Sequence, residues 1–227
     1  MTSTEKSPVR SRRIQGLDAE QRRARRREQI LAAAFELIAV DGYVNTAIEQ
    51  ICQTAFVGNK AFYELFDSKE SCYLALLQQL SERAQAEVAT ALAECTGGRD
   101  EVVSVVVAAF AHSLVDDPRV AQVTFGEASG ISAKVEQQRR TNRRWAAQFL
   151  ETLWREYEFV PAAGIGIDLH ALAVSTIGGL FDTVADWLHQ TAAGTTGEID
   201  TLIRDLTTFT DIVHLGLAAA AEKYAGR

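Results

Sequence analysis

Residues 46–70 have the sequence TAIEQICQTAFVGNKAFYELFDSKE, and this stretch decides the fold of the chain. It predicts two short helices around a three-residue turn at 55–57, followed by the start of a third helix. Thr46 is expected to be the N-cap of the first short helix. Glu49 stands three residues later and gives the T-x-x-E capping box, in which hydroxyl and carboxylate satisfy each other's backbone N–H groups.

The second short helix, predicted over residues 58–66, has two different faces. Phe62 and Phe66 lie four residues apart and share one face, by which the helix can pack on its neighbour. The outer face then carries an amide, a cation and a phenol, from Asn59, Lys60 and Tyr63. A short helix of this kind suits the DNA major groove, so the stretch is interpreted as a helix-turn-helix.

These residues resemble the DNA-binding head of the TetR (tetracycline-repressor) family of bacterial transcription regulators. The family pattern is roughly T-x-x-x-I-A-x-x-A-G-V-S-x-x-x-x-Y-x-x-F-x-x-K-E, and the chain is expected to match it with Thr46, Ile51, Ala55, Val57, Tyr63, Phe66, Lys69 and Glu70. Phe56 replaces the turn glycine, the residue that tolerates a positive φ freely, and Gly58 replaces the Ser or Thr that caps the recognition helix. The resemblance covers about residues 20–75.

The resemblance implies a set of DNA contacts, from Thr46, Gly58, Asn59, Lys60, Tyr63 and Lys69. Asn59 and Lys60 are expected at base edges, the Asn with adenine and the Lys with guanine. Tyr63 matches a position whose hydroxyl reaches a phosphate, with a half-buried aromatic that braces the helix as the alternative. Thr46 and Lys69 stand at predicted helix N-termini, where phosphates bind, and Thr46 can also be a cap alone.

Composition favours an all-α chain, with an N-terminal three-helix helix-turn-helix DNA-binding domain and a larger helical domain for ligand binding and dimerisation. Of the 227 residues, 47% are hydrophobic and only three are proline, and no long alternating β-branched run occurs. A disordered basic arm is predicted over 1–18, the DNA-binding domain over 19–68 and the second domain over 69–227.

Charge is distributed unevenly along the chain. Residues 1–27 carry nine basic and three acidic side chains, a net charge of +6, whereas the rest of the chain carries −13. A basic end can bind phosphates while the acidic remainder is repelled by DNA. The arginines of this end, Arg22, Arg23, Arg25, Arg26 and Arg27, are therefore candidates for phosphate or minor-groove contact, with a solvated start of the first helix as the alternative.

Helical spacing and helix breakers predict the remaining helices. A first helix over 21–40 ends at Asp41-Gly42, as it would at a C-cap. After the recognition helix, the predicted helices span 69–95, 100–114, 119–128, 132–159, 168–190 and 198–221. The three cysteines have no C-x-x-C spacing, which suggests a protein of the reducing cytoplasm. The sequence has no apolar run long enough to span a membrane and no signal peptide, so no membrane partner is expected.

The last two predicted helices resemble the dimerisation pair of the family. The final helix carries an apolar stripe of Leu202, Leu206, Phe209, Val213 and Leu217. The helix before it has small residues that allow close approach, namely Ala171, Ser175, Gly178 and Gly179. Periodicity does not separate a dimer interface from an intramolecular core. A homodimer on a palindromic operator is favoured, because one short reading helix contacts few base pairs.

The middle of the chain, about residues 75–190, shows no catalytic constellation, so no enzyme activity, cofactor or metal site is expected. Its bulky side chains are mostly core. In a protein resembling this family, some of them line a pocket for a small molecule that is largely apolar. The candidates for ligand binding are Phe110, Phe125, Trp145, Phe149, His170 and Phe181.

Four arginines, Arg139, Arg140, Arg143 and Arg144, form i,i+4 pairs of like charge. The favoured interpretation is a solvated face paired with acids elsewhere, and the alternative is a patch for an anionic ligand or a partner. The resemblance implies a homodimeric repressor that a small molecule releases from its operator by shifting the helix after residue 69. The alternative function is an all-helical small-molecule-binding or scaffold protein with a degenerate DNA-binding head.

Overall fold

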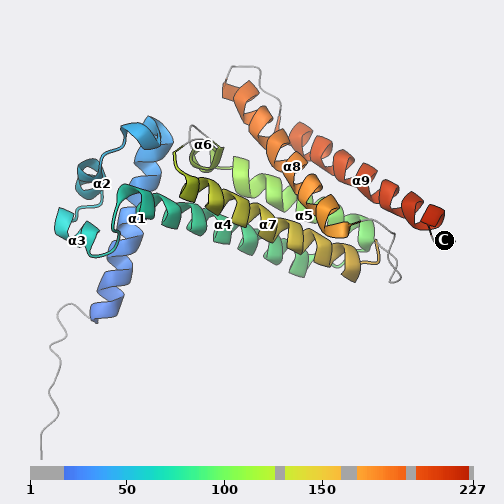
Figure 1. The fold of residues 1–227 in the computed structure, drawn as a ribbon, viewed down its shortest axis with the longest axis horizontal. Coiled ribbons are helices and arrows are strands. Elements are labelled where there is room, and N and C mark those ends of the chain that lie inside the picture. Colours follow the sequence, from blue (N-terminus) through green and yellow to red (C-terminus); the bar gives the residue numbers. More distant parts are fainter. Residues whose placement is uncertain (1–17, 126–130, 160–167, 193–197, 225–227) are drawn as a thin grey trace, which may run out of the picture.

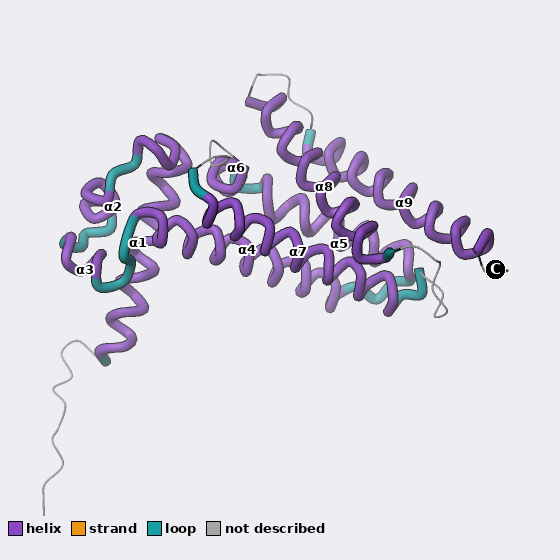
Figure 2. Tube along the Cα trace, in the orientation of Figure 1, coloured by secondary structure: helices purple, strands orange, loops and turns teal. Residues whose placement is uncertain are grey.

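The computed structural model describes residues 18–125, 131–159, 168–192 and 198–224, and every regular element within these ranges is a helix (Figures 1 and 2). This confirms the all-α prediction. The head at one end of the molecule contains α1 (Ala19–Asn45), α2 (Ile48–Thr54) and α3 (Asn59–Tyr63). The body contains α4 (Lys69–Glu94), α5 (Arg99–Val115), α6 (Pro118–Phe125), α7 (Ala133–Glu156), α8 (Leu169–Ala192) and α9 (Ile199–Tyr224). The predicted basic arm lies outside the described residues, apart from Asp18.

Helix α1 begins two residues before its predicted start and is interrupted where its end was predicted. Asp18 and Gln21 form a reciprocal capping box, in which each backbone N–H donates to the other side chain, at 2.8 and 3.0 Å. Gly42 has a φ of 78°, a conformation that glycine adopts without a Cβ clash. The helix is therefore kinked at Gly42, and its last helical residue is Asn45.

The capping role predicted for Thr46 is wrong. Helix α2 has Ala47 as its N-cap, and the Gln50 side chain, not that of Glu49, accepts a 2.7 Å hydrogen bond from the Ala47 N–H. In the family pattern the threonine stands four residues before the isoleucine, which is position 47 here and not 46. Thr46 is buried, and its hydroxyl donates to the Gly42 carbonyl at 2.8 Å. It therefore satisfies a carbonyl at the end of α1 rather than an N–H of α2.

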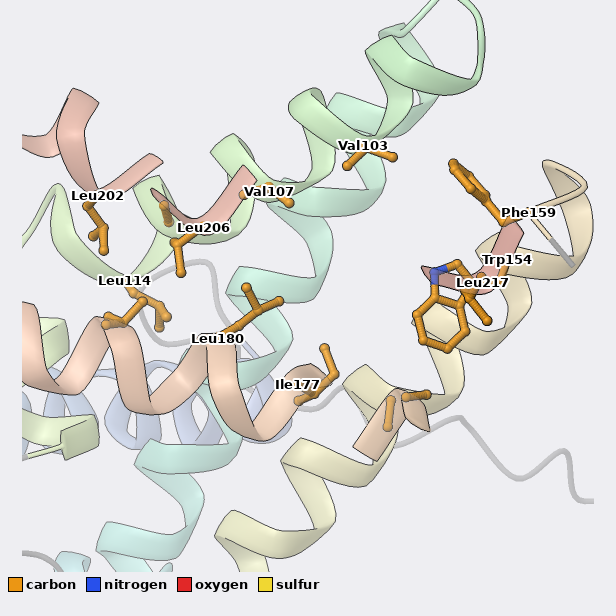
Figure 3. Close-up of a cluster of buried hydrophobic side chains, with 14 of the residues drawn as sticks. Val103, Val107, Leu114, Trp154, Phe159, Ile177, Leu180, Leu202, Leu206 and Leu217 are labelled. Atoms are coloured by element: carbon orange, nitrogen blue, oxygen red, sulfur yellow. The ribbon is translucent and has the colours of Figure 1, made fainter. Parts of the chain in front are cut away.

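Two hydrophobic cores meet along α4 and α6. The head core contains the buried residues of α1, α2 and α3, and it is completed by Cys72, Tyr73, Leu76 and Leu77 of α4, Val123 of α6 and Val135 of α7. The body core joins side chains of α5, α7, α8 and α9, several of which converge in Figure 3. It also includes Val120 of α6. Helix α6 thus contributes one valine to each core.

By length and composition, α8 is the one described helix able to cross a membrane, with a mean hydropathy of 1.2 over Leu169–Thr191. In the structure it packs against α7 and α9. Its residues in the body core are Leu169, Ala173, Ile177, Leu180 and Val184. Packing inside the helical body therefore accounts for part of the apolar character of α8.

Tyr73 of α4 is joined to α6 by a buried hydrogen bond within the head core. Its ring lies 4.9 Å from the ring of Tyr43, and its hydroxyl donates to the Val123 carbonyl of α6 at 2.8 Å. Burial raises the pKa of the Tyr73 hydroxyl to about 12, because the phenolate would lose its hydration. Burial likewise raises the pKa of the neighbouring Cys72 thiol to about 12. Tyr73 and Cys72 are therefore both uncharged at neutral pH.

Replacement of Tyr73 by Phe is expected to lower the free energy of unfolding by about 1–3 kcal/mol, because the Val123 carbonyl loses its buried partner. The pKa of Tyr73 in the folded chain lies above its usual value of 10, so its stabilisation is complete below pH 10 and is lost as the pH rises through about 12. Urea unfolding at neutral and stepwise higher pH measures both effects. The variant should show a shallower alkaline decline, with Cys72 responsible for part of the remainder. An identical decline in the two proteins would contradict this role.

Candidate DNA interface and ligand cavity

Helix α3 packs its aromatic face on the head core and exposes its polar face. Phe62 is fully buried and Phe66 nearly so, and their ring centroids lie 5.6 Å apart. On the other face Asn59 and Lys60 are exposed, and Tyr63 is more than half exposed. These are the two faces that the sequence predicted. The helix itself ends at Tyr63, three residues earlier than predicted.

Phe56 adopts the backbone conformation of the glycine that it replaces at the end of α2. Its φ is 53°, and its side chain is 94% exposed. The Phe56 N–H donates to the Gln53 carbonyl at 3.2 Å, and the Val57 N–H donates to the Cys52 carbonyl at 3.0 Å. These are the two hydrogen bonds of a Schellman motif. The turn is therefore formed normally, at a conformational cost of about 1–2 kcal/mol for a residue with a Cβ.

Gly58 is the N-cap of α3 without a side-chain hydrogen bond. Its φ of −80° and ψ of 155° are ordinary extended values. No atom lies within 4 Å of the position that a Cβ would take, so the backbone has no need of glycine there. Neither Gly58 nor Phe56 distorts the helix-turn-helix, although both depart from the family pattern.

Phe56→Gly is expected to raise the free energy of unfolding by about 1 kcal/mol, because glycine adopts a positive φ without a Cβ clash. Phe56→Ala is the matched control, since it removes the same exposed ring but keeps a Cβ in the turn. Urea unfolding of the three proteins gives the comparison. An equal gain in both variants would attribute the effect to loss of the ring and contradict the backbone explanation.

Lys69 binds the carbonyls at the end of α1 instead of facing outward. Its ammonium donates to the Tyr43 and Thr46 carbonyls at 2.8 Å and to the Val44 carbonyl at 3.3 Å. It also lies 4.4 Å from the centroid of the Tyr43 ring. An ammonium has three N–H donors, and all three have partners here. Burial lowers the pKa of Lys69, because the charged form loses hydration.

The structure separates the six residues predicted at the DNA into two groups. Four lie on or beside the exposed face of α3, namely Gly58, Asn59, Lys60 and Tyr63. The other two are built into the head: Thr46 is only 1% exposed and offers almost no surface to a phosphate, and the donors of Lys69 are directed at carbonyls. The sequence did not reveal this, because the partners of Lys69 lie 23–26 residues away.

The basic side of α1 adjoins the end of the recognition helix. The Arg23 guanidinium donates to the Glu64 carbonyl at 3.3 Å, and the Arg26 guanidinium lies 3.7 Å from the Glu64 carboxylate. Arg27 lies over the Phe66 ring, 5.8 Å from its centroid. Positive charge from α1 thus lies at the C-terminal end of α3.

The body encloses a cavity of about 230 Å³ between α4, α5, α6, α7 and α8. Four of the predicted ligand-binding residues line it, namely Phe110, Phe125, Trp145 and Phe181. Phe181 packs against both other phenylalanines, with ring centroids 5.2 Å from Phe110 and 5.9 Å from Phe125. The rest of the wall is mainly aliphatic and includes Leu77, Leu80, Val88, Leu114 and Val120.

The two remaining candidates lie elsewhere. Phe149 lines a second cavity of about 80 Å³ and stacks on Trp145, with ring centroids 5.5 Å apart. His170 lies outside both cavities, with a half-exposed side chain and its Nδ1 3.5 Å from Glu151. Its position near the start of α8 directs it to the surface. Among the described residues, no group of three or more His, Cys, Asp or Glu could hold a metal ion.

The four arginines of α7 face in two directions. Arg139 and Arg143 line the cavity, whereas Arg140 and Arg144 line a shallow surface depression. Arg140 pairs with Glu136 at 3.0 Å, as the favoured interpretation of a solvated face requires. Spacing four residues apart explains the division, because each i,i+4 pair shares one face of the helix.

The apolar stripe of α9 packs mostly inside its own chain. Leu202, Leu206 and Leu217 are buried in the body core, so the assignment of these residues to a dimer interface is wrong. Other apolar side chains are exposed on α8 and α9, namely Val174, Phe209, Ile212 and Leu215. Of these, Phe209 belongs to the predicted stripe, and Ile212 and Leu215 follow it at intervals of three residues.

Residues 30–76 match a family model described as bacterial regulatory proteins, tetR family. The head of the chain therefore matches the TetR family. The matched residues extend from the buried part of α1 through α2 and α3 into the second turn of α4, and therefore include the whole helix-turn-helix. The head thus has the helix-turn-helix of this family, and the body is a helical domain.

Solved TetR-like structures share this fold. The fatty acid degradation regulator FadR from Bacillus halodurans is 20% identical, over 81% of this chain and 93% of its own, with a TM-score of 0.68. FadR from Bacillus subtilis in complex with stearoyl-CoA is 20% identical, over 80% and 95%, with a TM-score of 0.66. A TetR-family regulator from Syntrophomonas wolfei is 16% identical, over 86% and 97%, with a TM-score of 0.69. No curated protein matches the chain by sequence.

Proposed function

We propose that the chain is a homodimeric repressor that leaves a palindromic operator when a small molecule with an apolar chain enters the body. Residues 19–68 would bind DNA, and residues 69–227 would bind the ligand and the second subunit. The observation that carries the proposal is the position of Leu77 on α4, which belongs to the head core and also lines the cavity. The protein would act in the cytoplasm by binding alone, without catalysis.

The exposed face of α3 supports sequence-specific DNA binding. Asn59 and Lys60 stand at the N-terminal end of the helix, which enters the major groove in helix-turn-helix proteins, and would contact base edges. Tyr63 and the arginines beside Glu64 would contact phosphates. The normal geometry of the turn at Phe56 and Gly58 weighs against a degenerate head.

The exposed face of Val174, Phe209, Ile212 and Leu215 supports a homodimer. These side chains are between 38% and 70% exposed, a larger apolar surface than a helix facing water requires. The same α8–α9 face of a second copy would cover them in a two-fold arrangement. Two heads related in this way would reach half-sites about 34–36 Å apart.

The apolar cavity supports an effector with a hydrocarbon chain. Its walls are aromatic and aliphatic, and such walls bind ligands mainly by removing their apolar surface from water. The similar FadR structure from Bacillus subtilis contains stearoyl-CoA. An acyl-CoA or a related fatty acid derivative is therefore the effector class that we propose. Its binding must favour the conformation that does not bind DNA, since equal affinity for both conformations would release nothing.

Selection of a random double-stranded DNA pool by the purified protein tests the proposal. An enriched inverted repeat, whose affinity falls steeply with salt, is the expected result. A folded protein that enriches no sequence at low salt would contradict DNA recognition.

Two lysines of the head should then behave differently on the selected operator. Lys60→Ala is expected to relax base preference at one position of each half-site, at a cost of about 1–3 kcal/mol, while the thermal stability stays close to that of the wild type. Lys69→Ala should lower the thermal stability, because the Tyr43, Val44 and Thr46 carbonyls lose their charged donor. Binding curves on point-mutated operators and melting curves of both variants provide the measurement. Unchanged preference in Lys60→Ala would remove this lysine from the interface.

A further inference from the structure

The cavity wall is positively charged, although the chain as a whole carries a net charge of −7. Arg139 and Arg143 line it, and no Asp or Glu does. The other polar side chains of the wall are uncharged, namely Ser81, Gln85, Thr124 and Asn142. Two guanidinium groups beside an apolar chamber, without an acidic partner in the wall, suit a ligand with an apolar chain and an anionic group.

Arg139 also binds the C-terminal end of α6. Its guanidinium donates to the Thr124 carbonyl, and Tyr73 donates to the preceding carbonyl, that of Val123. Carbonyls at the end of a helix lack partners within the helix and form the negative end of its dipole. Near the last described residues of α6, two side chains therefore donate to its carbonyls, one from α4 and one from α7, and of these two only Arg139 lines the cavity.

Helix α6 connects this point to the head. At its N-terminal end, the Arg119 guanidinium lies 2.6 Å from the Glu36 carboxylate of α1 and over the Phe35 ring, 5.2 Å from its centroid. Near its other end, Val123 is buried in the head core. A displacement of α6 therefore changes the packing of α1. The recognition helix α3 packs in the same core as α1.

We propose that Arg139 and Arg143 bind an anionic group of the effector, and that this group competes with the end of α6 for Arg139. The inference rests on the proposed function, because it names the polar part of the same effector. A carboxylate or a phosphate group of coenzyme A offers the required chemistry. When the anion engages Arg139, the Thr124 carbonyl loses its charged donor, and α6 packs less firmly on α1.

The two arginines of the subsite have different second partners. Arg143 lies 3.8 Å from Asp182 and over the Phe181 ring, so its acidic and aromatic partners are both on α8. It should contribute to ligand affinity but not to the response of α6. Arg140, adjacent in sequence to Arg139, faces the surface and pairs with Glu136. It provides a control of equal charge on the same helix.

Calorimetry and amide hydrogen exchange, both without DNA, test the inference. The probes are decanoyl-CoA, decanoate and decanol, which share a hydrocarbon length, with stearoyl-CoA as a longer probe. The proteins are the wild type and the variants Arg139→Gln, Arg143→Gln and Arg140→Gln, with Arg139→Lys added as a variant that keeps the charge. Exchange is followed over α6 and the part of α1 that contacts it, at saturating probe.

At least one anionic probe should bind the wild type about tenfold more tightly than decanol and accelerate exchange in α6 severalfold. A phosphate requirement would leave decanoate weak and the CoA esters tight, whereas a carboxylate requirement would reverse this order. Arg143→Gln should lower the affinity for that probe but keep the full response of α6 at saturation. Arg139→Gln should show fast exchange in α6 before any probe is added and little further change. Arg140→Gln should match the wild type.

The inference is overturned if decanol binds as tightly as the anions, or if Arg139→Gln and Arg143→Gln respond alike. It is also overturned, together with the proposed effector class, if no probe binds to the folded wild type. A normal response of α6 in a protein that selects no operator would instead contradict the proposed DNA recognition and leave the subsite standing. These results separate the failure of the two proposals.

Discussion

Helices α4 and α6 each pack against the head and the body at once, and the rest of the structure depends on this sharing. Leu77 is buried in the head core and lines the cavity, while Val123 and Val120 of α6 belong to different cores. Close-packed interiors do not deform continuously, so a ligand that displaces either helix must also repack the head. The buried hydrogen bond from Tyr73 to Val123 joins the two helices at the point where the cores meet.

Local spacing explains which features of the head were predictable. Phe62 and Phe66 lie four residues apart, and this alone placed them on the inner face and Lys60 on the outer one. The cap of α2 was placed one residue too early, since a Thr and a Glu three residues apart gave a local pattern as good as that of Ala47 and Gln50. The role of Lys69 could not be predicted from local spacing, because its carbonyl partners are distant in sequence and lie beside it only in the folded chain.

In the body, periodicity identified apolar faces but not what covers them. Leu202, Leu206 and Leu217 were recognisable as one stripe, yet the same stripe fits an interface with a second subunit or a core within the chain. The division between Arg139 and Arg140 likewise depends on how α7 is rotated against α6 and α8. His170 shows the limit of residue type as evidence, because its place near the start of α8 puts it at the surface, away from the cavity.

Coupling of the cavity to the head would change the spacing of the two heads within the proposed dimer. A spin label at Gln53→Cys in a Cys95→Ser background leaves only Cys52 and Cys72, which are buried, and distances between labels can be measured with and without decanoyl-CoA or stearoyl-CoA. One narrow distance distribution, compatible with half-sites about 34–36 Å apart, is expected without ligand, and a shifted or broader one with ligand. An unchanged distribution in a dimer saturated with ligand would contradict this coupling.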